Sequence, residues 1–252
     1  MTKPWYRYQP ARNLLKGRVI LVSGAAHGLG RMAAHTYAGH GATVILLDHD
    51  EKALEKLYDL MVEQQLPEPV LVCHDLRSFD LDEANKIAEQ ITAHLGRLDG
   101  FLHSAGMLGM LGPIEDTDPK LWLQTLQVNL NSAFLLLKVL LPLLKRAPDA
   151  AILLTSAAEQ RLSRAYWNAY AVAAVGVDTL CRIVADEIDF VPGLRINSLD
   201  PGDVNTRIFR QAFPGRELDN VRGTESLQMA YLYLMGPDSH HIRGCKLSLQ
   251  SE

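Results

Sequence analysis

Short apolar runs alternate along the chain with longer segments in which apolar residues recur every three or four positions. Because the apolar runs lack polar alternation, they predict strands buried on both faces. Right-handed crossovers between such strands give a doubly wound parallel α/β sheet of the Rossmann type, with helices on both faces. No composition shift or repeat divides residues 1–252, so one domain is expected. Strands are predicted at 19–23, 43–47, 70–74, 98–103, 151–155, 195–198 and 244–249, and helices at 29–40, 51–65, 81–95, 119–144, 166–191 and 225–235.

A cluster of glycines joins the first predicted strand to the first predicted helix. Gly24, Gly28 and Gly30 follow an apolar run and precede a helical pattern, in the spacing G-x-x-x-G-x-G. Glycines allow a sharp turn and a close approach to a pyrophosphate, and the helix N-terminus offers free N–H groups. The pattern favours a dinucleotide site, with tight turns alone as the alternative.

Composition and charge exclude several classes of function. A formal net charge of −4 leaves no basic footprint for nucleic acid or for an anionic membrane. The three cysteines are far apart and beside mainly apolar segments, so we expect buried thiols in a reducing compartment. The nine histidines show no ligand spacing with these cysteines, so no metal site is predicted.

The sequence shows no signal for export or membrane insertion. Residues 1–13 lack an apolar core of the kind found in signal peptides. The longest apolar run, 133–144, contains Lys138 and Pro142 and is too short to span a bilayer. We therefore expect a cytoplasmic protein without a membrane partner.

Further motifs follow in a fixed order. Asp75 comes after the third strand, and Ala105-Gly106 after the fourth. Asn129 lies in the middle helix and Tyr170 near the start of a later one, while Asn197, Pro201-Gly202 and Thr206 follow the pattern N-x-x-x-P-G-x-x-x-T. In this order and over nearly the whole length, the chain resembles the classical short-chain dehydrogenase/reductase family, most closely its YciK-type bacterial branch.

The resemblance implies roles for these residues. Asn129 and Tyr170 would be catalytic, and Asp75 would contact adenine. The nicotinamide dinucleotide would lie against Gly24, His27, Gly28, Leu29, Gly30, Asp48, Asp75, Leu76, Ala105, Gly106, Pro201, Gly202 and Thr206.

Asp48 bears on the choice of cofactor. It ends the second strand, 18 residues after Gly30, where a carboxylate can accept hydrogen bonds from ribose hydroxyls. It would repel a 2′-phosphate, so NAD(H) is favoured and NADP(H) remains possible. Two alternatives stay open: Asp48 begins a turn, or His27 helps to hold a phosphate.

Two of the four working groups of the family are replaced. The lysine expected four residues after Tyr170 is Ala174, and the serine expected thirteen residues before it is Ala157; Ser104 replaces the asparagine before Ala105. A tyrosine at its usual pKa of about 10 is ionised at roughly one part in a thousand at pH 7, so proton abstraction is weakened. Substitutes considered are Ser156, if the strand bulges, Tyr166 on the same helix face, and the guanidinium groups of Arg161 and Arg164.

Three functions are consistent with these residues. The first is an oxidoreductase that transfers hydride between the cofactor and an unidentified carbonyl or alcohol, with a weakened site. The second is an NAD(H)-binding pseudoenzyme with a sensing or partner-binding role, and the third is a scaffold. Small residues along 166–191 and the family resemblance favour a homodimer or homotetramer, although the same residues would also allow packing within one subunit.

Overall fold

Seven parallel strands form a single sheet in the order β3-β2-β1-β4-β5-β6-β7. The computed structural model describes residues 4–158, 161 and 164–250. The chain leaves β1 in one direction and returns to the other side of it at β4, which opens a crevice at the carboxyl ends of these two strands. The predicted doubly wound sheet is confirmed. The strands are β1 (Val19–Ser23), β2 (Thr43–Asp48), β3 (Val70–Cys73), β4 (Gly100–His103), β5 (Ala150–Thr155), β6 (Leu194–Asp200) and β7 (Lys246–Ser248).

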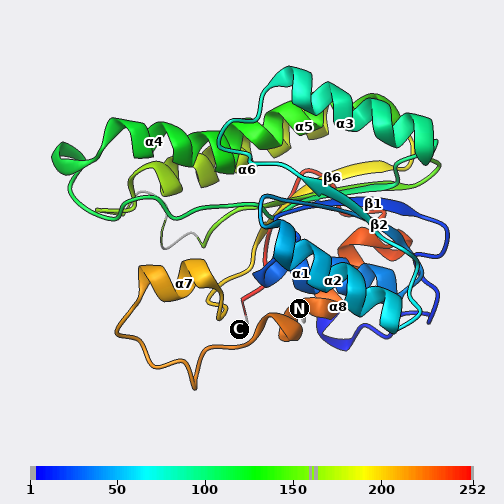
Figure 1. Cartoon of the computed structure of the whole chain (residues 1–252), viewed down its shortest axis with the longest axis horizontal. Coiled ribbons are helices and arrows are strands. Elements are labelled where there is room, and N and C mark those ends of the chain that lie inside the picture. Colours follow the sequence, from blue (N-terminus) through cyan, green and yellow to red (C-terminus); the bar gives the residue numbers. More distant parts are fainter. Residues whose placement is uncertain (1–3, 159–160, 162–163, 251–252) are drawn as a thin grey trace.

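Helices cover both faces of the sheet (Figure 1). One layer contains α1 (Gly28–Gly39), α2 (Glu51–Glu63) and α8 (Gln228–Met235). The other contains α3 (Leu81–His94), α4 (Pro119–Leu126), α5 (Ser132–Leu144) and α6 (Asn168–Glu187). The short helix α7 (Arg207–Ala212) stands away from the sheet, on the side of the molecule where α4 extends beyond it.

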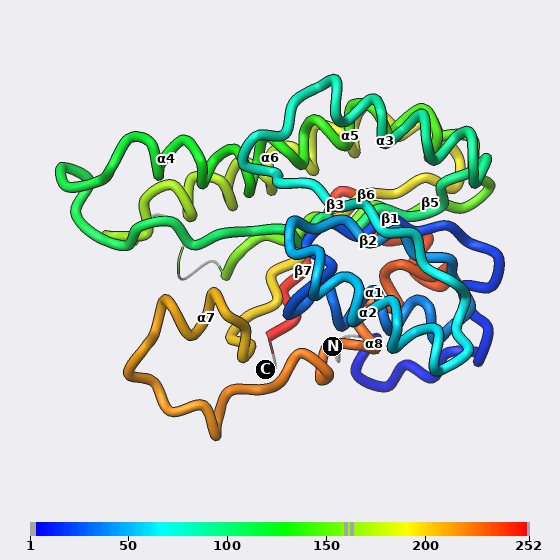
Figure 2. Tube along the Cα trace, in the orientation of Figure 1, coloured from blue at the N-terminus to red at the C-terminus, as the bar shows by residue number. Residues whose placement is uncertain are grey.

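The two ends of the described chain lie side by side (Figure 2). The N-terminal arm contains a short 3-10 helix, Pro4–Arg7, and its Tyr6 hydroxyl donates to the carbonyl oxygen of Gln250 at 2.7 Å. The arm thus packs near α8 and the last strand, where Trp5 is buried.

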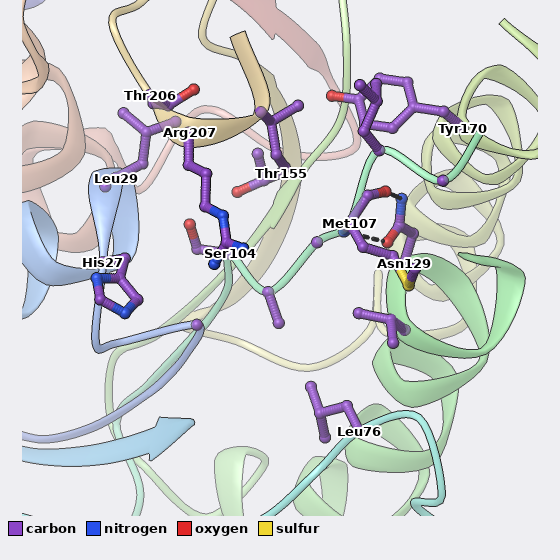
Figure 3. Close-up of a pocket in the computed structure, with 18 of the residues that line it drawn as sticks. His27, Leu29, Leu76, Ser104, Met107, Asn129, Thr155, Tyr170, Thr206 and Arg207 are labelled. Atoms are coloured by element: carbon purple, nitrogen blue, oxygen red, sulfur yellow. Dashed lines mark hydrogen bonds between the residues drawn. The ribbon is translucent and has the colours of Figure 1, made fainter. Parts of the chain in front are cut away.

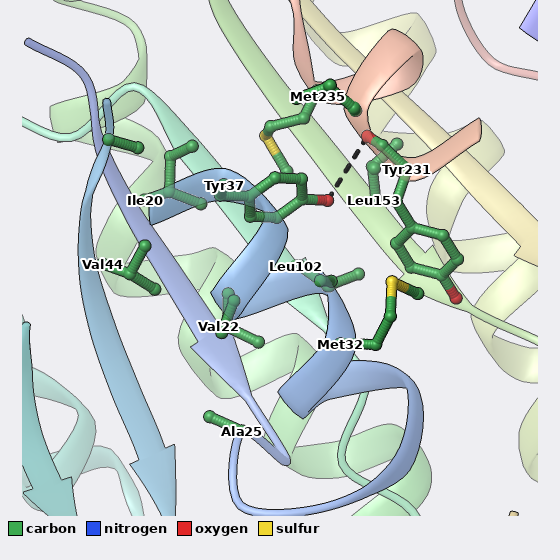
Figure 4. Close-up of a cluster of buried hydrophobic side chains, with 14 of the residues drawn as sticks. Ile20, Val22, Ala25, Met32, Tyr37, Val44, Leu102, Leu153, Tyr231 and Met235 are labelled. Atoms are coloured by element: carbon green, nitrogen blue, oxygen red, sulfur yellow. Dashed lines mark hydrogen bonds between the residues drawn. The ribbon is translucent and has the colours of Figure 1, made fainter. Parts of the chain in front are cut away.

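The core beneath β1 fixes the strand that carries the glycine turn (Figure 4). Ile20 and Val22 of β1 pack against α1 and α8 in one buried cluster. The hydroxyl of Tyr37 donates to the carbonyl oxygen of Tyr231 at 3.4 Å, which links the two helices. Burying such large side chains contributes about 1.5–3 kcal/mol each, so the end of β1 is held firmly in place.

The predicted helix over 119–144 is interrupted by a π-helical segment, Gln127–Asn131. Asp118 caps the start of α4 as expected, because its carboxylate accepts the N–H of Lys120 at 2.9 Å. The π segment contains Asn129, and such widened turns occur frequently at functional sites. Hydrophobic periodicity alone does not reveal it, because the helix continues in α5 without a break in its apolar pattern.

Helix α6 begins at Asn168, two residues later than predicted. Tyr166 and Asn168 have φ angles of 76° and 39°, so the backbone turns sharply before the helix. The amide of Asn168 fixes this turn by donating to the Gly112 carbonyl at 2.9 Å and to the Thr117 hydroxyl at 2.8 Å. Tyr166 is exposed and outside α6, so the suggestion that it shares a helix face with Tyr170 is wrong.

Two further expectations need correction. Cys181 is buried, but Cys73 and Cys245 are exposed, because Cys73 ends β3 and Cys245 precedes β7, the two strands at the edges of the sheet. The segment Pro119–Leu144 and helix α6 are long and apolar enough to cross a bilayer by length and composition, contrary to our estimate from the run 133–144 alone. Both segments also contribute buried residues to the core, as the central helices of such sheets do.

Candidate functional site

A cavity of about 490 Å³ lies at the carboxyl ends of the central strands (Figure 3). Loops after each of the strands β1 to β6 contribute to its walls, since parallel strands all end at this edge of the sheet. Of the residues predicted from the sequence, the cavity is lined by Gly24, His27, Gly28, Leu29, Asp48, Asp75, Leu76, Ala105, Gly106, Asn129, Tyr170, Pro201, Gly202 and Thr206.

The three glycines of the turn have different structural roles. Gly24 has a φ of 71°, and a Cβ there would lie 2.6 Å from the backbone nitrogen of Ala105. Gly30 is not among the residues that line the cavity, contrary to prediction; a Cβ there would overlap the carbonyl oxygen of Gly24. Gly28 has a φ of 52° and faces the cavity. Two glycines therefore allow close packing, and the third opens the site.

The N-terminus of α1 points at this cavity without a capping side chain. His27 is the N-cap residue, and its side chain accepts no hydrogen bond from the first turn. Helix N-termini present unpaired N–H groups and a positive dipole end, both suited to an anion. An uncapped N-terminus beside Gly28 fits the pyrophosphate of a dinucleotide.

Asp48 lines the cavity, but its carboxylate is bonded to the protein. One oxygen accepts the N–H of Ala26 at 3.0 Å, and the other accepts the N–H of His49 at 2.7 Å. The imidazole Nδ1 of His49 lies 2.9 Å from that second oxygen, and the Asp48 residue is 8% exposed. The carboxylate therefore ties the glycine turn to the end of β2, so the alternative in which Asp48 organises a turn agrees with these contacts.

Asp75 and Arg77 form a second charged pair at the edge of the cavity. The Arg77 guanidinium donates through Nη2 at 2.6 Å and through Nε at 2.9 Å to the same carboxylate oxygen. This pairing lowers the pKa of Asp75 and keeps it ionised. Leu76, between them, is almost fully buried and provides an apolar surface at this end of the cavity.

Asn129 fixes the loop that follows β4. Its side-chain oxygen accepts the N–H of Met107 at 2.8 Å, and its amide donates to the Met107 carbonyl at 2.9 Å (Figure 3). Both polar ends of the side chain are thus used to hold Met107 against the π segment. For Asn129 to act directly in catalysis, either its backbone would take part or its side chain would first have to release these two hydrogen bonds.

Tyr170 lies on the first turn of α6, and its ring and hydroxyl point into the cavity (Figure 3). Burial raises its pKa above the usual value, and Arg161 opposes that rise. The sequence has no lysine between Lys145 and Lys246. Ala174 stands one turn further along α6 and lines the same cavity. At neutral pH the phenol is therefore a proton donor and not a base.

Ser156 faces the cavity, although strand alternation placed it on the opposite side. Strand β5 ends at Thr155, so the two-residue period does not extend to the following pair. Ser156 lines the cavity, and its hydroxyl donates to the carbonyl oxygen of Ala174 at 3.3 Å. Ala157 is buried and is not among the lining residues. A serine hydroxyl is thus available near Tyr170 without a lysine.

Arg161 is the cationic group that the structure places beside Tyr170. Its guanidinium carbon lies 5.5 Å from the ring centroid of Trp167, and that ring lies 5.7 Å from the ring of Tyr170. Arg161 also pairs with Asp203 and is only 13% exposed. The other candidate, Arg164, is exposed and lies outside this cavity.

Some lining residues escaped the sequence analysis. Arg207 follows the motif residue Thr206, and Figure 3 shows its side chain directed into the cavity. Thr155 lines the cavity, though we had assigned it to the strand alone. Asn197, by contrast, is buried away from the cavity, where its amide donates to the Ile242 carbonyl at 2.8 Å. The positions of Arg207 and Thr155 depend on where strands and loops end, and periodicity locates these ends only approximately.

His103 links the ends of strands β4 and β1. It is buried at the end of β4, and its Nδ1 lies 2.9 Å from the hydroxyl oxygen of Ser23 at the end of β1. Burial lowers the pKa of His103 to about 4, so the ring is neutral near pH 7. The pair joins the two strands between which the crevice opens.

Comparison with known proteins agrees with this geometry. The family model described as enoyl-(acyl carrier protein) reductase matches residues 24–247. The uncharacterized oxidoreductase YciK of Escherichia coli K12 is 36% identical over 243 residues, which cover 96% of each chain.

Two solved structures contain a cofactor. A putative short chain dehydrogenase from Shigella flexneri 2a, complexed with NADP, is 35% identical, with a TM-score of 0.92 over 96% of this chain and 100% of the other. One from Escherichia coli CFT073, complexed with NADPH, is 36% identical, with the same TM-score and coverage. Together with the parallel sheet and the glycine turn, these matches show that the chain belongs to the short-chain dehydrogenase/reductase family of oxidoreductases.

Proposed function

We propose that the protein is an NADP(H)-dependent reductase that converts a carbonyl compound to an alcohol. The observation that carries this proposal is the presence of the uncapped α1 N-terminus and of Tyr170 on one cavity. A pyrophosphate at the first feature places the rest of the dinucleotide along the cavity toward the second. Pro201, Gly202 and Thr206 line the cavity between them and would hold the nicotinamide end.

The chain's own groups supply the proton. The Tyr170 hydroxyl donates its proton to the carbonyl oxygen of the substrate, and solvent returns a proton to the tyrosinate. Ser156 turns its hydroxyl from the Ala174 carbonyl toward the same oxygen and polarises the carbonyl bond. Bound NADP(H) would supply the hydride to the carbonyl carbon, so that two electrons and two hydrogens complete the alcohol.

The site favours reduction over oxidation. Oxidation of an alcohol needs ionised Tyr170 as a base, and burial raises its pKa above a reference at which only about one part in a thousand is ionised at pH 7. Reduction needs the neutral phenol, which dominates under the same conditions. With Ala174 in the lysine position, Tyr170 is therefore held in the protonated form with which reduction begins.

Bonding within the protein accounts for the preference for NADP(H) over the NAD(H) favoured from the sequence. The Asp48 carboxylate accepts hydrogen bonds from Ala26 and His49, so ribose hydroxyls would compete with these donors. His27, His49 and Arg77, each paired with a carboxylate, have exposed side chains around the same end of the site, and their remaining nitrogen atoms would bond to a phosphate there. The relatives complexed with NADP and NADPH support this preference.

Titration of the purified protein with NADPH and NADH tests the cofactor. NADPH is expected to bind at least tenfold more tightly, as measured by quenching of tryptophan fluorescence or by calorimetry. In Leu29→Glu the new carboxylate lies beside the proposed pyrophosphate, so affinity for both nucleotides should fall, whereas the uncharged Leu29→Gln should change it much less.

Each outcome decides a separate part of the proposal. Tighter binding of NADH would overturn the NADP(H) preference and keep the nucleotide site. Failure of both nucleotides to bind at millimolar concentration would reject the site itself. Reduction of no compound in a broad panel of aldehydes, ketones and quinones, despite binding, would reject the reaction.

A cofactor-binding pseudoenzyme is the second candidate. The specific observation in its favour is the pairing of a raised Tyr170 pKa with Ala174 in the lysine position. In that case the cavity would sense the nucleotide, and any activity of the preparation would be independent of Tyr170.

A homodimer or homotetramer is also part of the proposal. The small residues of α6 do not support it, because Ala169, Ala173 and Ala174 are buried within the subunit. Exposed apolar side chains on α4, α5 and α6 support it instead, and these are Leu123, Phe134, Val172, Val175 and Ile183.

Sedimentation at micromolar concentration is expected to show a dimer or tetramer. Val172→Glu combined with Ile183→Glu should shift the protein toward monomer, because buried interface charges are costly. Val62→Glu, equally exposed on α2 in the other layer, serves as the control. A wild-type monomer would contradict this assembly.

A further inference from the structure

A second cavity adjoins the site beyond Tyr170 and is rich in arginine. It lies between the segment before α6 and helix α7 with its following loop. Arg161 belongs to the walls of both cavities, which therefore adjoin at this side chain. Arg164 and Arg216 line the second cavity as well, and Asp203 is the acidic residue among the described lining.

The charges of this cavity do not balance. Asp203 bridges two guanidinium groups, one from Arg161 and one from Arg216, the latter at 2.7 Å. With Arg164 added, three positive charges face one negative charge among the lining residues that the structure describes, in a chain whose net charge is −4. One carboxylate cannot satisfy the ten N–H donors of two guanidinium groups, so donors remain for a further acceptor.

Aromatic rings hold the two paired arginines in place. Besides Trp167, Arg161 lies over the ring of Phe213 at 5.6 Å. Arg216 lies 5.4 Å from the ring centroid of Phe209. Stacked guanidinium groups have little freedom left to lose and are suited to bidentate recognition of an anion. Trp167 and Phe213 thus form an apolar surface that extends from Arg161 to Tyr170.

We propose that this cavity binds an anionic group of the substrate, a carboxylate or a phosphate ester, through Arg161 and Arg216. The inference rests on the proposed function for the position of the reacting carbonyl. The carbonyl would lie at Tyr170, the apolar body along Trp167 and Phe213, and the anion at the guanidinium groups. The substrate class is thus an aldehyde or ketone with an anionic group at the far end of an apolar or aromatic body.

Binding is tested without turnover, so failure of the reaction and failure of this site remain distinguishable. With NADPH present, benzoate and phenyl phosphate are titrated by calorimetry, with benzyl alcohol as the neutral probe. At least one anion is expected to bind tenfold or more tightly than benzyl alcohol, equally well in Tyr170→Phe, and less tightly as salt rises. The tighter of the two anions identifies the group as carboxylate or phosphate.

Two substitutions are expected to change the affinity for the anion in opposite directions. They separate a residue that binds the anion from one that only supports the local structure. Arg161→Gln should weaken anion binding at least tenfold, with Arg161→Lys intermediate, because lysine keeps the charge and loses the fork. Asp203→Asn should strengthen it severalfold, since both guanidinium groups lose their competing carboxylate. Equal binding of anions and benzyl alcohol, or weakening by both Arg161→Gln and Asp203→Asn, would overturn the proposal.

Kinetics provide a second measurement when turnover is present. The kcat/KM for 4-formylbenzoate should exceed that for its methyl ester at least tenfold in the wild type, and Arg161→Gln should abolish the difference. A ratio near one in the wild type would count against the site even if both compounds are reduced.

Discussion

Replacement of Tyr170 by phenylalanine is expected to lower the rate of carbonyl reduction at least a hundredfold. In the proposed reaction the hydroxyl is the proton donor, and a positioned acid contributes typically 10²–10⁴-fold. Affinity for NADPH should stay within about twofold, because the ring remains in place and the pyrophosphate site lies at the start of α1. Single-turnover reduction, followed by loss of NADPH absorbance, measures the effect.

The same variant separates the two candidate functions. Activity that disappears in Tyr170→Phe would rule out the pseudoenzyme, and activity that survives would show that the tyrosine does not donate the proton. Ser156→Ala gives a graded comparison: loss of one polarising hydrogen bond should cost roughly ten- to a hundredfold, with the pH dependence unchanged.

Introduction of lysine at position 174 is expected to restore alcohol oxidation near neutral pH. Residues 170 and 174 lie one turn apart on α6, and Ala174 lines the cavity, so an ammonium group there can reach the phenol. An adjacent positive charge lowers a tyrosine pKa by about 1–3 units. At a pH below the tyrosine pKa, each unit by which that pKa is lowered raises the ionised fraction tenfold. The rate of oxidation at pH 8 should therefore rise about tenfold or more.

The direction of the pH dependence follows from the raised pKa of Tyr170. In the wild type, the rate of oxidation should climb with pH up to and beyond 10, because ionised tyrosine is the base. Reduction should change little between pH 6 and 9, where the phenol is neutral. In Ala174→Lys the rise in oxidation should begin at lower pH.

Ala174→Met is the matched control, since its side chain has comparable length and no charge. Equal oxidation profiles for the lysine and methionine variants would show that charge at this position does not tune Tyr170. An unchanged wild-type oxidation rate between pH 7 and 10 would contradict the assignment of the tyrosine as the titrating base.

Much of the fold could be predicted from the sequence because each element has its own local cause. The uninterrupted apolar runs predicted buried parallel strands, and Asp118 before Pro119 predicted a helix start, as observed. Fourteen of the fifteen predicted site residues line one cavity, since strand ends and glycine turns meet at one edge of a parallel sheet. Gly30 is the exception, because its small size serves packing against Gly24.

The tertiary structure decided features that depend on how loops leave the strands. Ser156 faces the cavity only because β5 ends one residue earlier, and Tyr166 is excluded only because the backbone turns before α6. The glycine turn brings the N–H of Ala26 within hydrogen-bonding distance of the Asp48 carboxylate, and no residue pattern in the sequence predicts this contact.

The sequence by itself determined the sheet, the glycine turn and the absence of any lysine between Lys145 and Lys246, because these follow from residue identity and short-range periodicity. Only the tertiary structure brought Arg161, Arg216 and the aromatic rings of α7 together next to the site. Arg161 and Arg216 are 55 positions apart in the sequence, and both pair with Asp203 because the loops after β5 and β6 pack together.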